Sequence, residues 1–152
     1  MKKATFRELI MQDVEAKTSK EVIQKVGELF LKEGFVKDTY INAVQERELV
    51  YPTGLQLEGI GIAMPHTDPE HVNKPGICIA KLKEPVQFFH MGEEDVPVEA
   101  EMIFMMAITD PNAQIETLQK VLSVFQNPEV VAQFKATTDE ESLYAVAKEH
   151  IG

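Results

Sequence analysis

The sequence has little that would suit a secreted or membrane-bound protein. Among its 152 residues there is one cysteine, Cys78, and no tryptophan. A single thiol cannot form a disulfide within the chain, which indicates a reducing compartment. The longest uncharged apolar run, Met102–Ile108, is far shorter than a membrane span. The first residues are polar or acidic where a secretory signal is apolar, so we expect a cytoplasmic protein.

Basic residues are also scarce. Fifteen lysine and arginine residues against twenty-five aspartate and glutamate residues give a formal net charge of −10 at pH 7. A protein that binds the phosphate backbone of nucleic acid needs a basic face, and so does one that binds an anionic membrane surface, so both classes are disfavoured. A basic protein partner, or a small substrate held at a local positive spot, is compatible with this charge.

No serine- or glycine-rich linker, low-complexity tract or internal repeat divides the chain, so residues 1–152 are expected to form a single domain. Helix signals lie towards both ends, and strand signals lie in the middle. Strands are predicted around Leu9–Val14 and at Leu55–Leu57, Gly59–Met64, Ile77–Leu82 and Val98–Ile108. Helices are predicted from a capping box at Thr18–Glu21 to Gly34, from Asp38 to about Arg47, after Asp110-Pro111, after Asn127-Pro128 and after a second capping box at Thr138–Glu141. The fold class is therefore α/β, with a mixed parallel and antiparallel β-sheet flanked by helices on both faces.

The apolar spacing also predicts which side chains face the core. Cys78 lies in an apolar strand and is expected to be an inert core thiol. His90 and Met91 are expected in a loop ahead of the acidic run 93–95. The buried face of the helix after Asp110 is predicted to carry Ile115, Leu118, Val121, Leu122 and Phe125.

The segment Pro52–Val72 holds the residues best suited to chemistry. Three of its residues are closely spaced glycines, and Pro65 stiffens the backbone just before His66. This arrangement places a histidine at the mouth of a strand, where a neutral imidazole can accept a group covalently near neutral pH. An ordinary loop histidine would look the same, and the residues alone leave both interpretations open.

The stretch G-I-G-I-A-M-P-H-T, residues 59–67, resembles the active-site signature of enzyme IIA, the A component of the bacterial phosphoenolpyruvate-dependent sugar phosphotransferase system, in its mannitol/fructose type. The resemblance covers nearly the whole chain. Several further motifs follow one another in the same order as in the family. They are two helix ends with the sequences E-G-F-V and Q-E-R-E-L, the P-T-G-L turn, the E-P-V-Q-F segment and the helix after D-P-N. The combination of P-T-G-L-x-L-E with A-M-P-H-x-x-x-x-H-V is most similar to the galactitol branch.

The resemblance implies a phosphotransferase component that works through a phosphohistidine and needs no metal or organic cofactor. His66 matches the histidine that accepts a phosphoryl group from the phosphocarrier HPr, whose basic face an acidic protein would attract. The group then passes to the B component, enzyme IIB, usually onto a cysteine, for uptake and phosphorylation of a sugar or sugar alcohol such as galactitol. The membrane component IIC is involved only indirectly, and it selects the sugar.

Two residues are implied to hold the phosphoryl group beside His66. Arg47 matches a family arginine at the end of the second helix, near the active histidine, and a guanidinium can hold phosphoryl oxygens bidentately. Gln114 stands where mannitol-type members carry a second histidine; its amide can donate a hydrogen bond but cannot carry a proton. The helix N-terminus at Asp110–Gln114 also presents N–H groups that suit an anion.

Two further residues follow the signature histidine. Thr67 can contact the phosphoryl group through its hydroxyl or backbone N–H. His71 either supplies part of the missing histidine's role or is a loop residue, and its turn-like D-P-E-H context favours the loop.

Two alternative functions remain compatible with the sequence. Some domains of this family regulate other proteins according to their phosphorylation state and serve no transporter, with the same fold and histidine. A metal site at His66, His71 and His90 is a weaker alternative, because prolines interrupt helical pairing and no paired-cysteine or H-E-x-x-H spacing occurs.

Overall fold

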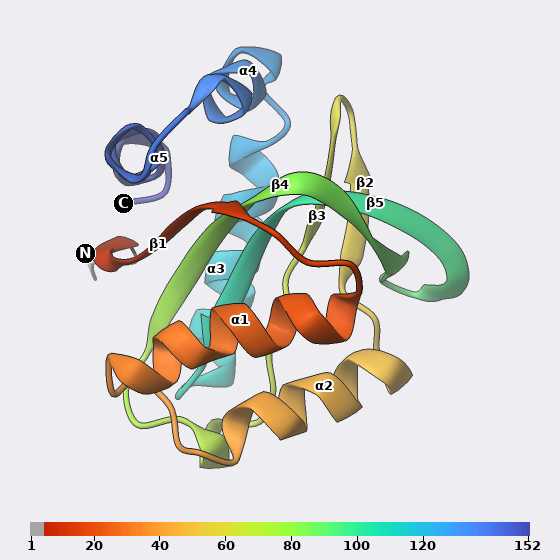
Figure 1. The fold of residues 1–152 in the computed structure, drawn as a ribbon, viewed down its shortest axis with the longest axis vertical. Coiled ribbons are helices and arrows are strands. Elements are labelled where there is room, and N and C mark those ends of the chain that lie inside the picture. Colours follow the sequence, from red (N-terminus) through yellow and green to blue (C-terminus); the bar gives the residue numbers. More distant parts are fainter. Residues whose placement is uncertain (1–4) are drawn as a thin grey trace.

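A mixed β-sheet with helices on both sides makes up the computed structural model, which describes residues 5–152 (Figure 1). The strands are β1 Thr5–Val14, β2 Gly54–Leu57, β3 Ile60–Ala63, β4 Gly76–His90 and β5 Glu93–Ala107. The helices are α1 Ser19–Lys32, α2 Tyr40–Val50, α3 Pro111–Val124, α4 Pro128–Ala136 and α5 Glu140–His150, with a 3₁₀ turn, η1, at Pro69–His71. The predicted α/β class is confirmed.

The pairing of the strands determines where the segment after β3 lies in the fold. The order is β1-β4-β2-β3-β5, and β4 also pairs with β5 in a long antiparallel hairpin. The short hairpin β2–β3 lies against this pair, with β3 parallel to β5. Because Ala63 pairs with Ile103, the chain that leaves β3 runs beside the last residues of β5 and towards the start of α3. This is where residues 64–68 lie.

The central strand β5 has a side-chain pattern that accounts for both helical layers. Met102, Phe104 and Met106 face one core, which α3, α4 and α5 cover. Ile103 and Met105 face the other core, which α1 and α2 cover. Alternate side chains of a strand point to opposite faces of a sheet, so this continuous apolar run is buried on both sides. Figure 1 shows α1 and α2 side by side in front of the strands, with α3 behind them.

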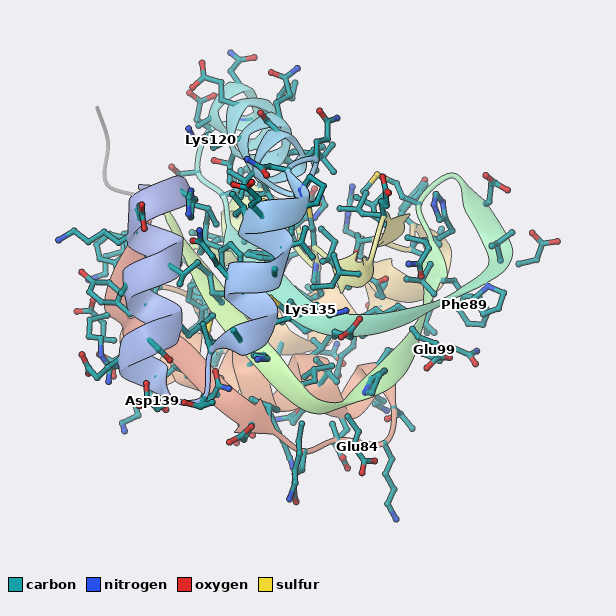
Figure 2. The ribbon with its side chains drawn as sticks, turned by 90° about the horizontal axis from the view of Figure 1, so that it is seen from above. Glu84, Phe89, Glu99, Lys120, Lys135 and Asp139 are labelled. Atoms are coloured by element: carbon teal, nitrogen blue, oxygen red, sulfur yellow. The ribbon has the colours of Figure 1, made fainter. Side chains whose placement is uncertain are left out.

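Several predicted helix starts are confirmed by their caps. Thr18 accepts a hydrogen bond from the backbone N–H of Glu21, and Asp110 and Asn127 cap α3 and α4 in the same way. The second capping box was predicted to begin at Thr138, but it begins one residue later. Asp139 (labelled in Figure 2) is the N-cap of α5 and forms the box with Ser142. The helix α2 starts after Thr39 rather than Asp38, and it extends to Val50, past Arg47.

Two local predictions were wrong. His90 ends β4 instead of lying in a loop, because β4 and β5 continue beyond the sheet core as a hairpin that turns at Met91 and Gly92. Gly92 has φ of +80°, the left-handed conformation that such a turn uses. Ile115 does not face the core, since its side chain is 54% exposed in the first half of α3.

Within the described part of the chain, no helix is both long and apolar enough to cross a membrane.

Candidate functional site

The loop that carries His66 is anchored on two sides. The backbone N–H of Met106 on β5 donates to the carbonyl oxygen of Pro65 at 3.0 Å. On the other side, the backbone N–H of Met64 donates to the hydroxyl oxygen of Thr53 at 3.2 Å. Gly61 allows this close approach of β3 to β5, because a Cβ there would collide with the carbonyl oxygen of Glu99 (labelled in Figure 2). The glycine therefore serves the packing that positions the loop.

The imidazole of His66 lies between two hydrogen-bond partners. Nδ1 is 2.9 Å from the carbonyl oxygen of Met64, and Nε2 is 2.9 Å from the side-chain amide nitrogen of Gln114. A carbonyl can only accept, so Nδ1 carries the proton. Nε2 then holds the lone pair and accepts from the amide of Gln114. The ring is thus kept in one tautomer, with its nucleophilic nitrogen turned towards α3.

The surroundings of His66 also keep its ring uncharged. Burial lowers the pKa of His66 below its usual value, and the nearby charge of Arg47 lowers it further. The hydrogen bond to the Met64 carbonyl and the charge of Asp68 act in the opposite direction, but they do not outweigh burial. A neutral imidazole near pH 7 has a free lone pair, which a nucleophile requires.

Arg47 lies in the last turn of α2, where a cation is favoured by the helix dipole. Its Nη1 is 3.7 Å from Oδ1 of Asp68, two residues beyond His66. The guanidinium also lies 5.2 Å from the ring centre of Tyr51. Its buried Nε has no hydrogen-bond partner among residues 5–152. A guanidinium with one long ion pair and an unused donor can turn towards an incoming anion.

Gln114 lies in the first turn of α3, which begins where β5 has passed His66. Its backbone N–H donates to the carbonyl oxygen of Asp110, and the carboxylate of Asp110 already accepts the backbone N–H of Asn112. The helix N-terminus is therefore partly occupied by its own cap. The group that α3 offers to His66 is the side chain of Gln114.

Thr67 and His71 differ in how the structure places them. Thr67 is buried next to His66, and its hydroxyl makes no hydrogen bond within residues 5–152. His71 is in η1, and its Nδ1 lies 2.8 Å from the hydroxyl of Thr39. Thr39 and Arg47 are eight positions apart along α2, about 12 Å along the helix axis. The structure therefore brings Arg47, Gln114 and Thr67 to His66, but gives His71 a contact at the other end of α2.

Glu48 belongs to this region although the sequence analysis did not select it. Its Oε1 and Oε2 accept hydrogen bonds from the hydroxyl and backbone N–H of Thr53, both at 2.8 Å. Burial raises the pKa of Glu48 to about 7, against the two Thr53 hydrogen bonds, which lower it. A signal was present in the sequence, because Tyr40, Val44 and Glu48 recur at helical spacing and place a carboxylate on an apolar face.

The chemistry that these groups can perform follows from their types. Among residues 5–152, no group of three histidine, cysteine, aspartate or glutamate side chains is placed to hold a metal ion. Cys78 is buried, and burial raises the pKa of its thiol above its usual value, so it is a poor nucleophile. Among the described residues, His66 is the group that combines an available ring nitrogen with neighbouring donors for an anion.

Comparison with known families decides the assignment. The family model described as "Phosphoenolpyruvate-dependent sugar phosphotransferase system, EIIA 2" matches residues 4–150. The chain belongs to this family. A type-2 EIIA protein is a phosphotransferase component, a phosphocarrier for sugar uptake that carries the phosphoryl group on a histidine.

Individual type-2 EIIA proteins agree with the family model. The galactitol-specific EIIA component of Escherichia coli strain K12 is 29% identical over 111 residues, which are 73% of this chain and 73% of that protein. The crystal structure of the mannitol IIA of Escherichia coli is 28% identical and has a TM-score of 0.75, covering 93% of this chain and 96% of that one. The IIA–phosphorylated IIB mannitol complex of Escherichia coli contains a chain that is 26% identical, with a TM-score of 0.73 and coverage of 91% and 93%. The resemblance seen in the sequence is thereby confirmed.

Proposed function

We propose that His66 is the residue of this EIIA protein that carries the phosphoryl group, with Nε2 as the accepting atom. The lone pair of Nε2 attacks the phosphorus of phosphorylated HPr, and a new N–P bond forms. The N–P bond of the donor breaks, and its electron pair returns to the donor imidazole. The proton of His66 stays on Nδ1 throughout and is donated in a hydrogen bond to the Met64 carbonyl, so no base has to remove a proton from the nucleophile.

The observation that supports this proposal most strongly is that both ring nitrogens of His66 are hydrogen-bonded, one to Met64 and the other to Gln114. Phosphoryl transfer requires mainly a correctly placed nucleophile and neutralisation of the charge on the transferred oxygens. The carbonyl of Met64 supplies the placement. Burial supplies the neutral ring, because it lowers the pKa of His66.

Three neighbours are proposed to receive the phosphoryl oxygens. When Nε2 bonds to phosphorus, it can no longer accept a hydrogen bond, so the amide of Gln114 is released to donate to a phosphoryl oxygen. The guanidinium of Arg47 exchanges its 3.7 Å contact with Asp68 for the more highly charged phosphoryl group. The free hydroxyl of Thr67 is the third donor.

The next step in the proposal is transfer to an enzyme IIB component, with a cysteine thiolate attacking phosphorus and the electron pair returning to Nε2 of His66. The similarity to a mannitol IIA that was solved with phosphorylated IIB supports this acceptor. The similarity to a galactitol-specific EIIA supports galactitol as the transported sugar alcohol. We place residues 1–152 in one EIIA domain that acts in the cytoplasm, in agreement with a chain that has one thiol.

The test of the proposal is phosphorylation by purified components. The protein is incubated with phosphoenolpyruvate, enzyme I and HPr, and acid-labile phosphate is measured. The His66→Ala variant should take up none, whereas His71→Ala and His90→Ala should each take up the wild-type amount. Phosphate on the His66→Ala variant would contradict the proposal. Purified galactitol-type and mannitol-type IIB proteins then compete for the phosphoryl group, and faster transfer to the mannitol-type protein would exclude the galactitol assignment.

A further inference from the structure

Three hydrogen bonds, which run through Met64 and Thr53, link Glu48 to the imidazole of His66. His66 Nδ1 donates to the carbonyl of Met64 at 2.9 Å. The backbone N–H of the same Met64 donates to the hydroxyl oxygen of Thr53 at 3.2 Å. The hydroxyl of Thr53 donates to Oε1 of Glu48 at 2.8 Å. The carbonyl and the N–H of Met64 belong to two different peptide groups, so these hydrogen bonds act together by fixing the backbone of Met64 in place.

The geometry of Thr53 depends on Glu48. Its side chain is fixed by one carboxylate oxygen and its backbone N–H by the other, each at 2.8 Å. Thr53 is 3% exposed, so water offers it no ready replacement for these acceptors. Thr53 in turn holds Met64 through its hydroxyl at 3.2 Å and its carbonyl oxygen at 3.3 Å. The backbone that orients the Met64 carbonyl is therefore tied to α2 through one carboxylate.

We propose that Glu48 is a positioning residue, which acts through Thr53 and Met64 to keep His66 in the Nδ1–H tautomer with Nε2 presented to the phosphoryl group. The inference rests on the proposed function of His66. The carboxylate takes no part in bond making, since it contacts Thr53 rather than the ring. The carboxylate is partly buried and is held in place by the two hydrogen bonds from Thr53.

The matched control is on the same helix. Glu46 is an exposed carboxylate that accepts a hydrogen bond from the side-chain amide of Asn42 at 3.3 Å, so Glu46→Gln makes the same chemical change without touching Thr53. Glu48→Gln keeps the size of the side chain but can accept through only one oxygen, and so loses one of the two Thr53 hydrogen bonds. Thr53→Val removes the hydroxyl that lies between Glu48 and Met64, whereas Thr53→Ser keeps a hydroxyl at this position.

The experiment measures both ring tautomer and transfer. Nitrogen-15 NMR of the unphosphorylated protein should show mainly the Nδ1–H tautomer of His66 in the wild type, Glu46→Gln and Thr53→Ser, and a raised Nε2–H fraction in Glu48→Gln and Thr53→Val. The kcat for phosphoryl uptake should fall about tenfold in the last two variants, with the KM for phosphorylated HPr within about twofold. The double variant should cost little more than either single one, because both interrupt one chain.

Two results would overturn the inference: an unchanged tautomer ratio in Glu48→Gln, or an unchanged kcat. A fall in kcat with an unchanged ratio has the same consequence, since Glu48 would then act by another route. The tautomer measurement needs no phosphoryl transfer. A failure of the function proposed for His66 would show as phosphate on His66→Ala, and is thus distinguishable from a failure of the role given to Glu48.

Discussion

The side-chain amide of Gln114 lies 2.9 Å from Nε2 of His66, on the ring nitrogen opposite the one held by Met64. In the unphosphorylated protein this amide donates to the lone pair of Nε2, which is the atom proposed to attack phosphorus. In the proposed mechanism, Gln114 orients the nucleophile before transfer and donates to a phosphoryl oxygen afterwards.

This relationship predicts the effect of replacing Gln114. Gln114→Ala should slow phosphoryl uptake from HPr about tenfold, since one neutral hydrogen bond to the transferred group is worth about 1 kcal/mol or somewhat more. Gln114→His, which carries the residue of mannitol-type members, should retain more of the rate. Rapid-quench measurement of single-turnover transfer checks both variants. A wild-type rate for Gln114→Ala would show that the amide does not contact the phosphoryl group.

Arg47 should affect both the rate and the protonation of His66. The charge of Arg47 is one of the causes that lower the pKa of His66, so Arg47→Ala should raise this pKa towards its usual value while slowing transfer. An NMR titration of the His66 ring measures the first effect. Arg7, an exposed arginine that pairs with Glu140 and Glu141, provides the control as Arg7→Ala. An unchanged pKa together with an unchanged rate would remove Arg47 from the site.

The pH dependence of stability should report the burial of Glu48. Its pKa of about 7 lies above the ordinary value of 4.5, so the folded state binds the proton more tightly than the unfolded state does. The stability from this group is fully present below pH 4.5 and is lost as the pH rises towards 7. Relative to Glu48→Gln, the wild type should lose on the order of 2 kcal/mol of unfolding free energy between pH 5 and pH 8.

Urea unfolding of both proteins at the two pH values measures this loss. The exposed Glu46 supplies the comparison, because Glu46→Gln should follow the wild type at both pH values. Parallel pH profiles for the wild type and Glu48→Gln would mean that Glu48 titrates as an exposed carboxylate.

Association with HPr should depend on salt. The net charge of −10 attracts a partner that is basic around its own histidine, and added ions screen this attraction. The second-order rate constant for phosphoryl uptake should therefore fall as sodium chloride is raised, while the single-turnover rate constant of the bound complex changes little. Salt-independent association would indicate that uncharged contacts govern docking.

Much of the fold was predictable because its signals are local. Thr18, Asp110 and Asn127 cap helices as their positions indicated, and the continuous apolar run Met102–Ile108 indicated a strand that enters the buried centre of the sheet. The far half of β4 was not predictable in this way. Lys83 and Glu84 resemble a loop in sequence, but they lie in an irregular part of β4, after which pairing with β5 resumes at Val86 and Phe88 returns to the core.

The site was predictable where one residue type carries the chemistry and not where contacts depend on the fold. His66, Arg47 and Gln114 come together as expected. Glu48 was missed because its importance comes from Thr53, five residues later across a turn, and from Met64 on another element. The placement of His71 beside Thr39 similarly depends on how η1 lies against α2, which no local pattern specifies.

The most direct test of the account is the identity of the phosphorylated atom. The protein, labelled with nitrogen-15 at histidine, is phosphorylated by phosphoenolpyruvate, enzyme I and HPr, and the N–P coupling is located by NMR. We predict one phosphohistidine, at Nε2 of His66, with Nδ1 still protonated against the Met64 carbonyl. Phosphate on Nδ1 of His66, or on His71, His90 or His150, would contradict the account.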